Sequence, residues 1–473
     1  MDAHRDFAVE EFADLQVDRR LRRRVVELTA TLATKPSGTV ASVYERAAER
    51  QAAYDLLSNP AVRSVELMAS MASATARRCC GAEFVFVPVD GTAITLSDHS
   101  KTKPLGSVGA RKFPTRGLLA VDAIAVAPNG TTLGLLDVRF WTRGASRNCT
   151  SRYKRRRLGT TEMRFWNAAI AAAESVLDEH APSVRPWFVM DREADEARVL
   201  RDVSRSNALF TIRAAQDRVV QHRGRRTKLF DAVRSTKLIA QRVVEVPQTP
   251  KRPARRATVA IRATKVTIVL PRYVGTKRER FLDVHVVEIS ELRRQRDRLH
   301  WVLLTNAPID NAADVDRVIR SYKTRWRIEE FHRTWKSGSC GLEDIQLRTP
   351  DGIRKWAIML AAVAARIERL KLLARTEPDS PATIELHEDE IAALILAKRR
   401  IKTSVETVPD GVPTIAVAVR WIAEIGGWAA QYKMGANPGS VTIGRGLERL
   451  AIWTSAVRFV HSDLENKKKK KKR

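Results

Sequence analysis

Residues that could hold a metal ion or a phosphate recur at helical spacing between Tyr322 and Lys336. If the segment is a helix with about 100° between residues, Arg325 lies at about 300°, Glu329 at about 340° and Lys336 at about 320° from Tyr322. The four side chains would then share one narrow face that extends over about 21 Å. A carboxylate within a row of phosphate-binding groups favours a metal ion held between the acid and a phosphate.

The other side of the same predicted helix is apolar. Ile328, Phe331 and Trp335 would cluster at about 180° to 240° on the same wheel, so we expect them to bury against a sheet. The alternative is a surface helix with ion pairs along it. That alternative is weak because Glu330, rather than Glu329, would complement the basic residues outside the shared face.

Two further acids, Asp90 and Asp191, each follow a dense apolar run, 84–89 and 186–190, that predicts a buried strand. A single aspartate at a strand end is more often a turn former than a ligand. Two of them on one predicted sheet improve the case for a site only modestly. Together with Glu329 they offer carboxylate oxygens, which hard divalent cations prefer.

The elements that must position these acids follow an α/β order. Residues 118–127 and 133–140 flank the turn Pro128-Asn129-Gly130 and predict a hairpin. A helix capped by Thr161, a strand, a second helix and another strand are expected at 161–179, 186–190, 194–203 and 208–214. Three strands followed by alternating helices and strands predict a mixed sheet.

The helical signal fades between 217 and 300, where 259–270 and 282–289 alternate as strands do. Basic runs at 223–228 and 251–256 predict exposed cationic loops, so we expect a β-rich insertion. A strand at 300–305 and a long helix, capped by Asp314 and running to Lys336, would complete the core within 301–350. The first part of the core would occupy 78–216.

The flanking regions read as helical. In 1–77, Asp18 can cap a helix that carries Arg19, Arg20, Arg22 and Arg23, and a second helix is expected at 43–57. This module fits a DNA-binding domain, although a solvated charged helix is equally consistent. Helices also return in 351–466, with 415–425 and 447–460 the best candidates. The basic tail, 467–473, predicts a disordered end.

Composition identifies the partner class. The 473 residues carry 84 Lys+Arg against 54 Asp+Glu, a formal charge of +30, which favours a polyanion such as nucleic acid. A membrane surface is the alternative, but there is no lipidation signal, and the apolar stretch 356–365 is too short to span a bilayer. The N-terminus has no apolar core of a signal peptide. The four cysteines, Cys79, Cys80, Cys149 and Cys340, lack zinc-ligand spacing, which fits a reducing cytoplasm.

The motif Tyr-x2-Arg-x3-Glu-x6-Lys at 322–336 resembles the signature of bacterial insertion-sequence transposases of the DDE type, which cut and paste through hairpin ends. Arg325-Trp-Arg-Ile-Glu-Glu-Phe-His and Asp191-Arg-Glu-Ala-Asp195 are similar to the same family. The resemblance extends from about Arg19 to Gln346, and more loosely to the C-terminus.

The resemblance implies an RNase H-like catalytic core in which Asp90, Asp191 and Glu329 form an acidic triad. We expect these three carboxylates to hold two Mg²⁺ or Mn²⁺ ions about 3.5–4 Å apart. The long gap between Asp191 and Glu329 then agrees with a β-rich insertion. The resemblance also implies a DNA transposase that is both an endonuclease and a strand transferase. It would act as a homodimer on double-stranded DNA, with a C-terminal dimerisation region, in the bacterial cytoplasm at the nucleoid.

DNA contacts are implied for further residues. Similar transposases place a tryptophan beside a flipped base, a position that Trp301 fits as well as it fits a core strand. Arg213 matches a phosphate contact of the family. The resemblance assigns phosphate binding to Tyr322, Arg325 and Lys336.

Three other functions remain open at this point. An RNase H-like nuclease or resolvase would share the triad but would not need the N-terminal module or the insertion. A non-catalytic regulator that binds transposon ends is possible, although all three acids are intact. A basic RNA-binding protein is the third, but the sequence contains no aromatic RNA-stacking motif.

Overall fold

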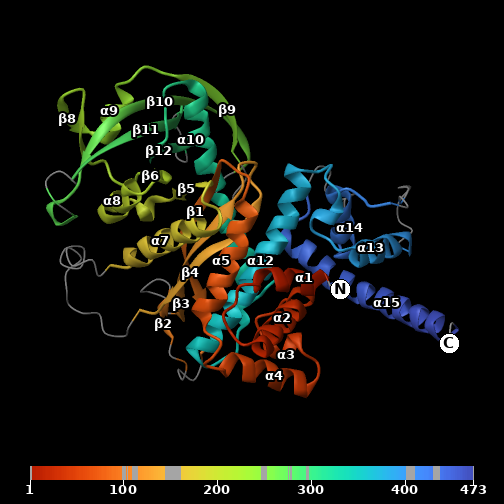
Figure 1. Cartoon of the computed structure of the whole chain (residues 1–473). Helices are drawn as coiled ribbons and strands as arrows, with labels where there is room; N and C mark the ends of the chain where they lie inside the picture. Colours follow the sequence, from red (N-terminus) through yellow and green to blue (C-terminus); the bar gives the residue numbers. More distant parts are fainter. Residues whose placement is uncertain are drawn as a thin grey trace.

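The computed structural model describes residues 3–98, 103, 105–108, 115–143, 161–246, 253–274, 276, 280–293, 298–400, 408, 411–429 and 437–471. In these residues one sheet of twelve strands forms the centre of the molecule (Figure 1). Its strands are β1 (Phe84–Thr95), β2 (Gly106–Val108), β3 (Thr115–Val126), β4 (Thr132–Trp141), β5 (Arg185–Met190), β6 (Leu209–Arg213), β7 (Val219–His222), β8 (Arg225–Lys228), β9 (Ala240–Val246), β10 (Arg255–Val269), β11 (Phe281–Glu291) and β12 (His300–Thr305).

The sheet is mixed, as the sequence predicts. Its order is β2-β3-β1-β5-β6-β12-β11-β10-β7-β8, with β4 beside β3 and β9 beside β10. Strands β1, β5 and β6 are parallel, whereas β3 and β4 form the expected antiparallel hairpin. The parallel strands need crossovers, which α7 (Met163–His180) and α8 (Ala197–Arg205) supply. The α/β fold class is therefore confirmed.

The strands between 217 and 300 do not form a body of their own. β12 pairs antiparallel with β6 and with β11, and β11 pairs with β10, so these strands continue the core sheet. The basic run at 223–228 includes strand β8 as well as the exposed turn before it, followed by α9 (Leu229–Arg234). Of the second basic run, Lys251 and Arg252 lie outside the described residues, as does Cys149, and Arg255 and Arg256 begin β10.

Two apolar layers cover the sheet. Alternate residues of a strand point to opposite faces, so Val85 and Phe188 pack with α7 and α8 on one side, and Phe86 and Trp187 belong to the other side. There the cover consists of α10 (Ala312–Thr324), α11 (Trp326–Lys336) and the long α12 (Pro350–Thr376). Short 3₁₀ turns lie at Arg192–Ala194, Arg272–Val274, Leu342–Asp344 and Ala382–Ile384.

Several predicted helix boundaries were wrong by a few residues. The helix expected from Asp314 begins at Ala312 because the Asn311 side chain accepts a hydrogen bond from the Asp314 amide. The helix is also interrupted at Arg325, which separates α10 from α11. α7 begins at Met163 without a side-chain cap, so Thr161 is not its cap. α8 begins at Ala197 instead of 194, behind a cap from Glu196.

Five helices precede the sheet: α1 (Ala3–Glu11), α2 (Arg19–Thr34), α3 (Val40–Val43), α4 (Ala47–Ser58) and α5 (Ser64–Cys79). The predicted cap of α2 is confirmed, since the Asp18 side chain accepts from the amides of Arg20 (2.9 Å) and Leu21 (3.0 Å). The second predicted helix starts at Ala47, four residues later than expected, and ends before Asn59 as expected.

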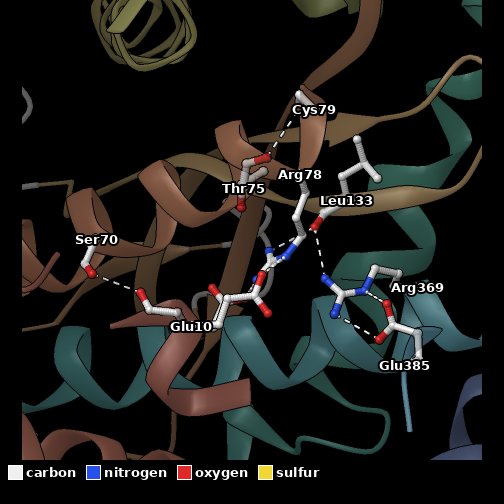
Figure 2. A network of polar contacts seen from close by, with 9 residues as sticks. Glu10, Ser70, Thr75, Arg78, Cys79, Leu133, Arg369 and Glu385 are labelled. Atoms are coloured by element: carbon white, nitrogen blue, oxygen red, sulfur yellow. Dashed lines mark hydrogen bonds and ion pairs between the residues drawn. The ribbon is translucent and has the colours of Figure 1, made fainter. Parts of the chain in front are cut away.

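Buried charge fixes the N-terminal helices to the core, as Figure 2 shows. Arg78 of α5 pairs with Glu10 (2.8 Å) and Glu11 of α1, and it donates to the Leu133 carbonyl of β4 (3.2 Å). Arg369 of α12 donates to the same carbonyl (3.4 Å) and pairs with Glu385. The N-terminal helices and α12 therefore meet at one carbonyl of strand β4.

The C-terminal region is helical: α13 (Glu388–Arg400), α14 (Ile415–Ile425) and α15 (Ser440–Lys471). α14 has the predicted bounds, and 447–460 lies within α15. The tail was expected to be disordered, but α15 continues through it to Lys471. None of the helices in the described part of the chain combines the length and the apolar character that crossing a bilayer requires.

A buried lysine joins the N-terminal helices to α12 and yields a prediction. Lys355, 1% exposed, donates to the carbonyls of Leu57 (3.0 Å) and Asn59 (2.9 Å) at the end of α4. Lys355→Met keeps the volume but leaves both carbonyls without this donor, so we expect the free energy of unfolding to fall by about 2–4 kcal/mol. Urea unfolding measures the loss, with Lys323→Met at an exposed position as control. Equal losses in the two variants would contradict the assignment.

Candidate active site

Asp90 and Asp191 lie on neighbouring parallel strands. The register of β1 and β5 pairs Val89 with Met190, so the two aspartates follow matched positions. Asp191 comes directly after β5, as predicted, and its Oδ1 accepts from the Glu193 amide (2.7 Å). Asp90 is not at a strand end, because β1 continues to Thr95 in antiparallel pairing with β3.

Helix α11 brings Glu329 to this edge. Arg325, at the junction of α10 and α11, donates from Nη1 to Asp90 Oδ2 (3.2 Å) and from Nη2 to Glu329 Oε1. The Arg325 side chain is 13% exposed, so these bonds form in a partly buried place where charge pairs interact more strongly than in water. One cation therefore bridges two of the three predicted acids.

The electrostatics of Asp90 reflect the third acid. The pKa of the Asp90 carboxyl is raised to about 6, mainly by burial and also by the negative charge of Asp191, while His332 and Arg325 act to lower it. The pKa of Glu193 is also raised, by burial and then by Asp191. Negative charge is thus concentrated at this edge of the sheet.

The remaining residues of the shared face also point to this edge. Lys336 Nζ lies 3.2 Å from Thr92 Oγ1 on β1 and 3.8 Å from Glu343. Tyr322 is buried, which raises its pKa, and it lies beside Arg213 and Arg325, whose charges lower it. The four predicted residues therefore occupy one face of α10 and α11, over β1.

Trp301 and Arg213 lie beside Tyr322. The Trp301 ring meets the Tyr322 ring edge to face, with centroids 5.0 Å apart. Arg213 Nη2 donates to the His300 carbonyl (2.9 Å), while its Nε is buried and has no hydrogen-bond partner among the described residues. Both residues belong to the strand pair β6–β12, so the extension of the sheet brings them to the site.

The apolar side of α11 is buried, as predicted, with Ile328, Phe331 and Trp335 each 0% exposed. It packs on α12 as well as on the sheet, because Trp335 Nε1 donates to the Ala357 carbonyl (2.9 Å). Glu330 pairs with Arg327 (2.7 Å) and Lys371 (3.3 Å), away from the shared face.

The basic residues of α2 are not brought to this cluster. Arg19 and Arg20 are exposed, Arg23 pairs with Glu27 (2.8 Å), and Arg22 Nε donates to the Leu15 carbonyl (3.1 Å). α2 packs on α1, α4 and α12. Arg22 therefore has a structural contact, whereas Arg19 and Arg20 leave their charge in solvent.

The donor set fits a hard divalent cation. In the described residues no group of three or more ligating side chains is already close enough to hold a metal ion. The Arg325 guanidinium nevertheless lies between Asp90 and Glu329, so those two oxygens are within reach of one positive charge. Carboxylate oxygens beside concentrated negative charge match the preference of Mg²⁺ and Mn²⁺.

Two features of the site were missed from the sequence. Trp326, at the start of α11 beside Arg325, is 51% exposed. Asp122 on β3 is buried and pairs with His332 of α11 at 2.7 Å. Each residue has a local signal of its own, since Asp122 interrupts the apolar run of 118–126 and His332 lies one helical turn after Glu329, but nothing in the sequence pairs them.

Three family models match the chain. A model described as transposase DNA-binding matches residues 4–62, which hold α1 to α4. A transposase DDE domain matches residues 167–365, which include Asp191 and Glu329, while Asp90 precedes the match. A transposase Tn5 dimerisation domain matches residues 362–467, from the second half of α12 into α15.

The raised pKa of Asp90 predicts how stability depends on pH without metal. Between the unfolded value, 3.8, and about 6, the folded chain holds a proton that the unfolded chain has lost. The free energy of unfolding therefore falls as pH rises through this window, by about 3 kcal/mol. Asp90→Asn has no such carboxyl, so in EDTA it should be more stable than the wild type above pH 6.

Urea unfolding at pH 4 and pH 7.5 tests this, because the difference between Asp90→Asn and the wild type should nearly vanish at pH 4. Asp137→Asn serves as a positive control, since burial also raises the pKa of that carboxyl to about 6. A difference for Asp90→Asn that stays constant across the two pH values would show that the carboxyl is not destabilised by folding.

Proposed function

We propose that Asp90, Asp191 and Glu329 form the catalytic triad of this chain, which is a metal-dependent DDE transposase with an RNase H-like core. As such an enzyme it cleaves DNA, transfers strands and forms homodimers. We further propose that it cuts the ends of its element through hairpin intermediates and joins them to target DNA by two-metal phosphoryl transfer.

The observation that carries the triad is the bridge made by Arg325. It bonds to Asp90 of β1 and Glu329 of α11, two residues far apart in the sequence. Asp191 follows the strand paired with β1, and its charge acts on Asp90. Two of the proposed ligands, from β1 and α11, thus share one guanidinium, and Asp191, directly after β5, lies close enough for its charge to act on Asp90.

When bound there, two Mg²⁺ or Mn²⁺ ions would activate the attacking oxygen and stabilise the leaving oxygen. The chain's own residues hold the DNA in line. With cations on those carboxylates, Arg325 would no longer be needed there and could bind the scissile phosphate. Lys336, further along α11, adds a second positive charge for the DNA backbone, and Tyr322 can donate a hydrogen bond to a phosphate oxygen. None of these three needs to act as a base.

In the proposed pathway water first cuts one strand and frees a 3′-OH. That hydroxyl then attacks the phosphate of the opposite strand, which forms the hairpin and releases the flanking DNA. Water reopens the hairpin, and the regenerated 3′-OH attacks target DNA. Each step exchanges one phosphodiester oxygen for another, so the same acids serve all of them.

Hairpin formation needs a sharply bent strand, and a base turned out of the stack relieves that bend. Trp301 presents an aromatic ring beside Tyr322, which suits stacking on such a base. Arg213 also lies beside Tyr322, and its Nε has no hydrogen-bond partner in the described residues. We therefore assign it a contact with a phosphate oxygen of the DNA next to that base. The exposed Trp326 adds a second aromatic group next to Arg325.

The regions outside the core complete the proposal. Arg19, Arg20 and Arg23 on α2 are exposed within the matched DNA-binding domain, so we assign them to phosphate contacts at the element ends. Along α15, within the matched dimerisation domain, Ile452 and Phe459 are 69% and 73% exposed. Exposed apolar side chains on one helix suit the contact between two copies. We place the protein at the nucleoid of the bacterial cytoplasm, where its substrate lies.

The triad assignment predicts separate effects on cutting and binding. Asp191→Asn and Glu329→Gln each remove a ligand charge, so cleavage at the element ends should fall by about 10³-fold or more. Binding to end DNA in EDTA should remain, because the DNA-binding residues are intact. Supercoiled plasmid carrying the ends, incubated with Mg²⁺ and separately with EDTA, measures cleavage, and Asp178→Asn on the exposed side of α7 is the control.

Binding by the wild type without cutting, in both Mg²⁺ and Mn²⁺, would instead favour a regulator that only occupies the ends. Metal-dependent cutting without strand transfer would favour a nuclease or resolvase. Normal cutting by Asp191→Asn would exclude that residue from the triad.

The proposed role of Trp301 predicts a defect in one step only. Trp301→Ala removes the stacking surface, which is worth about 1–3 kcal/mol per base, so hairpin yield should fall by about 10-fold or more. The first nick should continue at its normal rate. A denaturing gel separates nicked and hairpin products, and Trp301→Phe should retain most hairpin formation. Equal loss of both products would mean that Trp301 serves the fold instead.

A further inference from the structure

A buried pair beneath α11 has no role in the function proposed above. Asp122 of β3 is 0% exposed, and its Oδ2 lies 2.7 Å from Nε2 of His332. In the register of β1 and β3, Asp122 stands directly opposite Asp90. Side chains at paired positions project from the same face of a sheet, so the pair lies next to the first acid of the triad.

Among the described residues, the pair is one of three side-chain links between the Arg325–Lys336 segment and strands β1 and β3. Arg325 reaches Asp90, His332 reaches Asp122, and Lys336 reaches Thr92. Arg325 is expected to leave Asp90 when cations bind that carboxylate, and both Arg325 and Lys336 are expected to bind DNA phosphates. The His332–Asp122 link is the buried one, so it can persist throughout the reaction.

Burial of this carboxylate is costly. Asp122 Oδ1 has no hydrogen-bond partner in the described residues, and burial raises the pKa of its carboxyl, although the bond to His332 lowers it. An apolar residue would fill the same place at less expense, since replacing buried charge pairs with apolar residues is often neutral or stabilising. The position of the pair beside Asp90 therefore suggests that it serves the site.

We propose that His332, clamped by Asp122, is a positioning residue that fixes Glu329 relative to Asp90, so that both carboxylates present their oxygens to the same cations. Glu329 lies one helical turn before His332, and a histidine tied to β3 sets both the height and the rotation of that turn. Groups behind metal ligands commonly act in this way, and their loss weakens metal affinity or activity by about 10–100-fold. This inference rests on the proposed triad.

Two substitutions of nearly equal size separate positioning from bulk packing. In His332→Gln the amide nitrogen can take the place of Nε2 and keep the bond to Asp122. In His332→Asn the side chain is one methylene shorter and cannot reach. Thr334→Val is the matched control, because it removes another buried hydrogen bond of α11, the one to Glu368 on the side of α12.

Mn²⁺ binding to the full-length protein in complex with end DNA, followed by electron paramagnetic resonance, is the main measurement. We expect His332→Asn to weaken Mn²⁺ binding by about 10–100-fold, and His332→Gln and Thr334→Val to stay near the wild type. DNA affinity in EDTA should be unchanged in all three variants. The unfolding midpoint of each variant reports its structural loss separately.

Equal Mn²⁺ affinity of His332→Asn and His332→Gln would overturn the proposal. If His332→Asn does not fold, the double variant Asp122→Ala with His332→Leu removes both partners and leaves no orphaned charge. Wild-type Mn²⁺ affinity in that variant would likewise overturn the proposal, and a loss of about tenfold or more would support it. Asp90→Asn shows which of the two proposals fails. If this variant also binds Mn²⁺ normally, the proposed triad is wrong. If only this variant loses Mn²⁺ binding, the triad stands and the proposed role of His332 is wrong.

Discussion

The arrangement of the site depends on one guanidinium between two carboxylates. Acids brought together at a partly buried edge repel one another, and burial, together with the charge of Asp191, raises the pKa of Asp90 to about 6 even with Arg325 beside it. Arg325 offsets that repulsion by bonding to Asp90 and Glu329 at once. It can do so because it occupies the junction of α10 and α11, where the helix is interrupted next to β1. Arg325 thus lowers, without removing, the cost of holding these acids together in the absence of metal.

The sheet explains how residues so distant in sequence reach this guanidinium. Parallel pairing of β1 and β5 aligns Asp90 with Asp191, and the next strands, β6 and β12, bring Arg213 and Trp301 to the same side. The long segment between Asp191 and Glu329 therefore adds strands to the core sheet and supplies side chains to the site. A separate inserted domain could not place Trp301 against Tyr322 without a further interface.

The sequence correctly predicted features that depend on neighbouring residues alone. The cap at Asp18, the hairpin around Gly130 and the face shared by Arg325 and Glu329 each follow from a short pattern, and the structure contains them. Asp90 was misplaced at a strand end because Asp-Gly resembles a turn, whereas pairing with β3 carries the strand onward. The Asp122–His332 pair joins elements more than two hundred residues apart, and no local pattern connects them.

The two sides of α11 contact the proposed active site and the matched dimerisation domain, respectively. Its polar side carries Glu329, while on its other side Thr334 donates to Glu368 of α12, within the matched dimerisation domain. Ser440, at the start of α15, donates to the same carboxylate oxygen. Glu368 is 1% exposed, and a buried carboxylate that loses its donors is strongly destabilising. Helices α11, α12 and α15 therefore share one buried carboxylate, which fixes the C-terminal half of α11 to the matched dimerisation domain, whereas Glu329 faces β1 on the other side of the helix.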